Sequence, residues 1–145
     1  SSAFKQPEGS VYPSILQLNQ IEGPVQVDGA GGQIEFTPFE VAHGQITALG
    51  FRIGPVAYLP DVSTMPPAAW EALAGIDCWI LDALRRDPHP SHSHLAQSVE
   101  WINQSGVARA VLTNMHNDLD YATLMAELPK HILPAFDGMV LSYDL

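Results

Sequence analysis

The sequence predicts an α/β fold in which a mixed β-sheet carries helices on one face. Two observations predict it. Up to residue 59, extended stretches alternate with glycine-containing turns, which is typical of antiparallel hairpins. After Asp61, apolar runs of strand length alternate with segments of helical periodicity, which is typical of a sheet covered by helices. At 145 residues the chain has the size of one ordinary domain.

The first part of the chain contains four candidate strands. They are rich in β-branched and aromatic residues, and Gly29-Ala30-Gly31-Gly32 and Gly54-Pro55 supply tight turns between them. We therefore expect antiparallel pairing in this part. The candidate strands are 24–27, 33–41, 46–53 and 56–59.

The second part alternates helices and strands. Pro66-Pro67 opens a short helix, which Gly75 closes, and Leu95, Val99 and Ile102 mark one face of a second helix. The expected elements are a helix at 68–73, a strand at 78–84, the helix around 95–102, a strand at 110–113, a helix at 121–128 and extended structure over 132–143 around a turn at 136–138.

Composition and charge exclude several function classes. The net charge is −10 with only six Lys and Arg residues, so the phosphate backbone of a nucleic acid would be repelled. No run approaches about 18 apolar residues, so no membrane span is expected. The lone Cys78 lies in an apolar run, which predicts a buried thiol and is typical of a reducing cytoplasm.

Four residues with the chemistry of metal ligands or acid–base groups follow extended segments: His43, Asp61, His92 and His116. Functional sites of α/β sheets collect at such strand ends. Taken singly, each has an ordinary structural interpretation, as a turn or N-cap carboxylate for Asp61 and as hydrogen-bonded side chains for the histidines.

These residues lie within or beside a set of short sequence segments that follow one another along the chain: 36–44, 49–53, 56–63, 81–85, 88–92, 112–121 and 135–139. The ordered set resembles the later half of metallo-β-lactamase-fold hydrolases, and most closely their phosphoribosyl cyclic phosphodiesterase-like branch. The resemblance covers nearly the whole chain. It implies one half of a four-layer α/β/β/α sandwich.

The resemblance also implies roles for individual residues. His43 would complete a first divalent metal ion, Asp61 would bridge two ions and act in catalysis, and His116 would complete the second ion. Zinc or manganese suits such imidazole and carboxylate donors. His92 would lie near the substrate phosphate as a catalytic residue that donates to an oxyanion or protonates the leaving oxygen.

Two departures from the family pattern limit what the chain contains. The family motif His-x-His-x-Asp-His, which supplies the other ligands, has no match in residues 1–145. We therefore expect the chain to be the C-terminal half of the domain, inactive by itself, and to associate with the N-terminal half or with a second copy. Asn114 stands where many relatives have a ligand histidine, and a rearranged second metal site is an open alternative.

The function that these expectations favour is metal-dependent hydrolysis of a phosphodiester. The acidic chain favours a small cyclic-phosphate or nucleotide-like substrate over RNA. Two alternatives remain open, because a fold does not fix its chemistry. One is an acyl hydrolase that acts on a thioester or lactone, and the other is a non-catalytic, truncated binding or interaction module.

Overall fold

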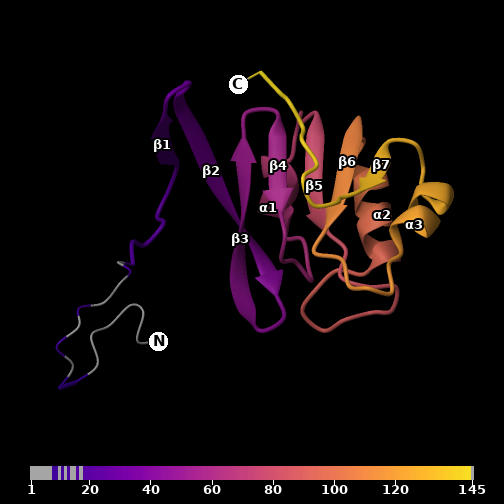
Figure 1. Ribbon diagram of the computed structural model, residues 1–145, viewed down its shortest axis with the longest axis horizontal. Helices are drawn as coiled ribbons and strands as arrows, with labels where there is room; N and C mark the ends of the chain where they lie inside the picture. The colour runs from indigo at the N-terminus through magenta and orange to yellow at the C-terminus, as the bar shows by residue number, and fades with distance from the viewer. Residues whose placement is uncertain (1–7, 10, 12, 14–15, 17, 145) are drawn as a thin grey trace.

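The computed structural model describes residues 8, 9, 11, 13, 16 and 18–144 (Figure 1). Seven strands form one sheet, in which the spatial order follows the chain order. The strands are β1 (Val25–Gly29), β2 (Gly32–His43), β3 (Ile46–Ile53), β4 (Val56–Leu59), β5 (Cys78–Asp82), β6 (Arg109–Thr113) and β7 (Ile132–Pro134), and the helices are α1 (Pro67–Ala72), α2 (Leu95–Ser105) and α3 (Tyr121–Glu127).

The sheet changes from antiparallel to parallel at β4. The strands β1 to β4 pair as hairpins, with Gly29 opposite Gly32 and Ile53 opposite Val56 at the turns. From β4 to β7 every pair is parallel, and a helix connects each strand to the next. Because such crossovers are right-handed, successive helices fall on the same side of the sheet. Figure 1 shows α1 and α2 behind it. The predicted mixed sheet with helices on one face is confirmed.

The hydrophobic core lies between the sheet and the helices. Alternate residues of the central strands point into it and are fully buried, among them Leu59, Trp79 and Leu81. Ile102 of α2 packs against them from the helix layer, as the helical spacing predicts. Cys78 is free and buried, as expected.

The opposite face of the sheet carries a row of apolar side chains across neighbouring strands. Phe51 lies opposite Tyr58, Tyr58 beside Ile80, and Ile80 beside Val111. Tyr58 is 40% exposed, whereas Val111 is buried. The segment after β7 passes in front of this face in Figure 1. Burial raises the pKa of Tyr143, which belongs to this segment. The row is therefore only partly covered within the chain.

Of the extended structure expected over 132–143, only Ile132–Pro134 pairs as a strand, and the expected turn at 136–138 is present, with Met139 N–H donating to the carbonyl of Phe136 (3.0 Å). β7 ends at Pro134, and Ala135 N–H donates the last bond along this edge to the carbonyl of Leu112 (2.9 Å). The partner strand β6 ends at Thr113, because Asn114 adopts a left-handed conformation (φ 58°) that turns the chain away. Residues after 135 thus have no strand to pair with.

In the part of the chain that the structure describes, none of the helices combines the length and the apolar character that crossing a membrane would require.

Candidate metal centre

One edge of the sheet gathers the candidate residues. Because β2 is antiparallel to β3 and β3 to β4, β2 ends at the same edge as β4 and the parallel strands after it. His43 ends β2, Asp61 follows β4, Asp82 ends β5 and Asn114 follows β6. This is the lower edge of the sheet in Figure 1. The strand-end pattern in the sequence thus becomes one cluster in space.

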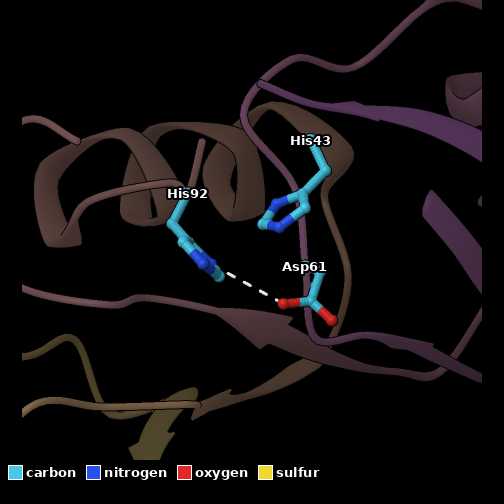
Figure 2. A group of neighbouring side chains, drawn as sticks. All are labelled: His43, Asp61 and His92. Carbon is cyan, nitrogen blue, oxygen red and sulfur yellow. Dashed lines mark ion pairs between the residues drawn. The ribbon is translucent and has the colours of Figure 1, made fainter. Parts of the chain in front are cut away.

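His43, Asp61 and His92 form a group whose ligand atoms all lie within 4.8 Å of one another. Figure 2 shows the three side chains converging on a common space. The rings of His43 and His92 meet edge to face, with centroids 4.5 Å apart, and His92 Nδ1 lies 3.8 Å from Asp61 Oδ1. The Asp61 side chain is 47% exposed and that of His92 16%, so the group opens to solvent on the side of Asp61.

A backbone carbonyl orients the His43 ring. Nδ1 lies 2.7 Å from the carbonyl oxygen of Ser91, and since a carbonyl can only accept, Nδ1 carries the proton. The lone pair is then on Nε2. Histidines that bind metals in proteins are held in this way, with one nitrogen donating to a fixed acceptor and the other free to bind.

Hydrogen bonds between two loops fix His43 relative to Asp61. Ser63 N–H donates to the carbonyl of Ala42 (2.8 Å), and the Ser63 hydroxyl accepts from Gly44 N–H (2.9 Å). An isolated bridge pairs Ala42 with Thr64 beside these bonds. The loop that follows β4 is therefore hydrogen-bonded to the end of β2, which fixes the two candidate ligands relative to each other.

A buried carboxylate that the sequence analysis did not single out lies behind His92. Asp82 is fully buried, and its Oδ2 lies 2.8 Å from His92 Nδ1. Burial raises the pKa of the Asp82 carboxyl, while the hydrogen bonds from His92 and Asn114 oppose the rise. The sequence did hold a signal, because Asp82 ends an apolar strand at the same edge as the other candidates.

The structure places His116 apart from the group of His43, Asp61 and His92. Its side chain is 60% exposed, and Nδ1 lies 3.1 Å from Asp118 Oδ1. Among the residues that the structure describes, the only group of suitable side chains close enough to hold a metal ion is the one that contains His92. The role of His116 at a second ion stays a prediction.

His89 and Asp120, which lie in loops at this edge of the sheet, have ordinary partners. His89 lies next to His92, with ring centroids 5.3 Å apart, and its Nδ1 accepts from Ser91 N–H (3.3 Å). Desolvation and the nearby Arg85 guanidinium lower the pKa of His89, which keeps its ring neutral at pH 7. Asp120 caps α3 by accepting from Thr123 N–H (2.8 Å).

The donors present suit a borderline divalent metal. His43 offers Nε2, and Asp61 offers two carboxylate oxygens on an exposed side chain. Imidazole nitrogen and carboxylate oxygen are the ligands that zinc and manganese accept in proteins, and the fixed ring of His43 lowers the entropy that binding costs. The residues at this edge therefore fit such an ion.

Comparison with known proteins decides the family. The profile of the beta-lactamase superfamily domain matches residues 3–115. The chain belongs to this superfamily. A solved diphosphatase of the PhnP family matches with 34% identity and a TM-score of 0.82, over 90% of this chain and 50% of that one. The resemblance to metallo-β-lactamase-fold hydrolases of the phosphoribosyl cyclic phosphodiesterase-like branch, predicted from the sequence, is confirmed, and the PhnP-family match supports it.

Two further proteins are similar to this chain at lower sequence identity. The metallo-β-lactamase-fold protein YhfI from Bacillus subtilis superposes with a TM-score of 0.64 at 17% identity, over 83% of this chain and 53% of that one, which shows the fold. An octanoyltransferase from Porphyromonas gingivalis (strain ATCC BAA-308 / W83) is 29% identical over 132 residues, 88% of this chain and 26% of that protein. The chain thus spans about half of the solved structures and about a quarter of this relative.

Proposed function

We propose that the chain is part of a metal-dependent phosphodiesterase that acts on a small cyclic-phosphate or nucleotide-like substrate. The observation that carries the proposal is the convergence of His43, Asp61 and His92 at the strand ends of a chain that resembles a PhnP-family diphosphatase. Asp61 and His43 would hold divalent metal ions, zinc or manganese. When bound, these ions would polarise a phosphoryl oxygen and lower the pKa of water.

The protein side chains have separate tasks in this proposal. His43 and Asp61 would bind the metal ions, and the hydrogen bonds between their loops fix the two residues relative to each other. His92, with its proton on Nδ1, can accept a proton at Nε2 from the attacking water and then donate that proton to the leaving oxygen. The three groups lie close enough together to act on a single phosphodiester.

Charge supports a small substrate. With a net charge of −10, the chain lacks the basic surface that would hold the many phosphates of RNA. A small phosphate ester carries its negative charge on one phosphate group, which would lie beside the metal ions. The two cations would offset the negative charge of the acidic residues around it. We also place the protein in the cytoplasm, where a single buried Cys78 stays reduced.

We further propose that the rest of the ligand set comes from outside residues 1–145. The diphosphatase is about twice as long as its match with this chain. The apolar row of Phe51, Tyr58 and Ile80 offers a partly exposed face on which a second sheet, or a second copy of the chain, could pack. By itself the chain would then bind metal weakly and show no activity.

An acyl hydrolase is the second candidate. The octanoyltransferase relative favours it, although three quarters of that protein lies outside the match and its named activity need not belong to the matched part. A non-catalytic binding module is the third. The three candidates differ in what they do to a phosphodiester and to an ester of a fatty acid.

The complete protein, loaded with Mn²⁺ or Zn²⁺, is expected to hydrolyse bis(p-nitrophenyl) phosphate and a nucleoside 2′,3′-cyclic phosphate but not p-nitrophenyl octanoate. Chelation should abolish the activity and metal should restore it, because the ions supply the charge that stabilises the transition state. Release of nitrophenol, followed by absorbance, measures both nitrophenyl substrates. Cleavage of the octanoate alone would establish the acyl reaction, and metal binding without any hydrolysis would establish the binding module.

A further inference from the structure

Asp82 accepts many hydrogen bonds at this edge of the sheet, through both its side chain and its backbone carbonyl. It is fully buried at the end of β5 and accepts five hydrogen bonds through its side chain and its backbone carbonyl. The hydroxyls of Ser93 and Ser98, both buried, donate to the carbonyl at 2.8 and 2.6 Å. Its backbone is therefore fixed to the loop of His92 and to helix α2.

The carboxylate of Asp82 joins the two loops that carry the candidate site. Oδ2 accepts from His92 Nδ1 at 2.8 Å and from Val62 N–H at 3.3 Å, and Val62 directly follows Asp61. A carboxylate oxygen only accepts, so this contact requires the proton of His92 to be on Nδ1. One buried group thereby sets both the tautomer of His92 and the path of the chain beside Asp61.

Asn114 completes the arrangement from β6. Its Nδ2 donates to Asp82 Oδ1 at 3.1 Å and to the carbonyl of Pro60 at 3.3 Å, just before Asp61. The backbone of Asn114 is left-handed (φ 58°), a conformation that asparagine tolerates better than most residues. The left-handed turn and the two amide bonds together account for asparagine at this position without a metal.

We propose that Asp82 and Asn114 are positioning residues. Asp82 holds His92 as the Nδ1–H tautomer with Nε2 free to accept a proton from a water or hydroxyl group, and Asn114 with Asp82 holds residues 60–62 so that Asp61 faces His92. The part of this inference that concerns tautomer and loop order is independent of the reaction. Only the use of Nε2 on a substrate rests on the proposed function.

The test of the tautomer is ¹⁵N–¹H correlation NMR on the complete protein with labelled histidine, with the His92 signals assigned from a His92→Gln variant. In the wild type, Nδ1 is expected as the protonated nitrogen and Nε2 as the unprotonated one. In Asp82→Asn the side-chain amide has only one oxygen, which cannot accept from both His92 and Asn114. We therefore expect the His92 proton to shift from Nδ1 to Nε2 in a large fraction of molecules.

Asp118→Asn is the matched control, because it removes the carboxylate that contacts His116 and leaves His92 untouched. It should change only the His116 signals. A wild-type His92 protonated on Nε2, or an Asp82→Asn variant in which His92 keeps its Nδ1 proton undiminished, would overturn the assignment to Asp82, whatever substrate the protein acts on.

Asn114→Gly tests the second half of the inference and keeps the test independent of how well Asp82→Asn folds. Glycine accepts φ 58° without strain and removes only the amide. We expect faster hydrogen exchange at residues 61–64 than in the wild type, with the tautomer of His92 retained. Unchanged exchange in this segment would show that Asn114 does not position Asp61.

A double-mutant cycle then separates a positioning role from a general loss of structure. If Asp82 acts through His92, Asp82→Asn should lower kcat by about 10- to 100-fold in the wild type but by less than about two-fold in His92→Gln. Equal losses in both backgrounds would mean that Asp82 acts on the fold alone. The NMR result distinguishes this outcome from a failure of the proposed phosphodiesterase activity.

Discussion

Asp61→Ala is expected to reduce the metal content of the complete protein toward zero and to abolish hydrolysis. The carboxylate is the one donor of the site that can present two oxygens to two cations, so its loss weakens both metal positions at once. Its side chain is half-exposed, so its removal leaves no cavity in the core and the fold should persist.

Metal analysis of the purified protein after dialysis measures this outcome. Asp77→Ala is the matched control, because Asp77 is exposed and precedes β5, at the opposite edge of the sheet. It should retain the full metal content. Two ions retained per molecule in Asp61→Ala would refute the bridging role.

His92→Ala is expected to lower kcat by about 10²- to 10⁴-fold, the range that a general acid or base contributes, while the metal content stays close to that of the wild type. Its Nδ1 is hydrogen-bonded to Asp82, which leaves Nε2 free for the proposed proton transfer. Because His92 also belongs to the group that could hold an ion, this experiment has two distinct outcomes.

Turnover and metal content are measured on the same preparation, with His131→Ala as a control from the far end of β7. Loss of metal in parallel with activity would make His92 a ligand. In that case the site would be formed by His43, Asp61 and His92, with His116 remaining on Asp118 as the structure places it.

The fold could be predicted from sequence where local chemistry sets it. The glycines that predict two of the three hairpin turns, the proline pair before α1 and the helical spacing of Leu95 and Ile102 each correspond to an observed element. The absence of strand pairing after Pro134 has a non-local cause. The residues are apolar enough for a strand, but no neighbouring strand continues beside them once β6 has ended.

The candidate site was predictable only in part for the same reason. His43 and Asp61 follow strands whose ends the sequence reveals, and the sheet topology then brings them together. Asp82 was not predicted as a site residue, because it ends an apolar run that resembles a core strand. Its partners are 10, 20 and 32 residues away along the chain. A buried carboxylate becomes visible as a site residue only when those partners converge in three dimensions.

The most direct test of the metal centre is an anomalous-difference map from crystals of the complete protein, recorded at the absorption edge of bound zinc or manganese. We expect a peak about 2.0–2.2 Å from His43 Nε2 and from a carboxylate oxygen of Asp61. Metal bound only at other side chains, or no peak beside His43 and Asp61 at saturating metal concentration, would contradict the account.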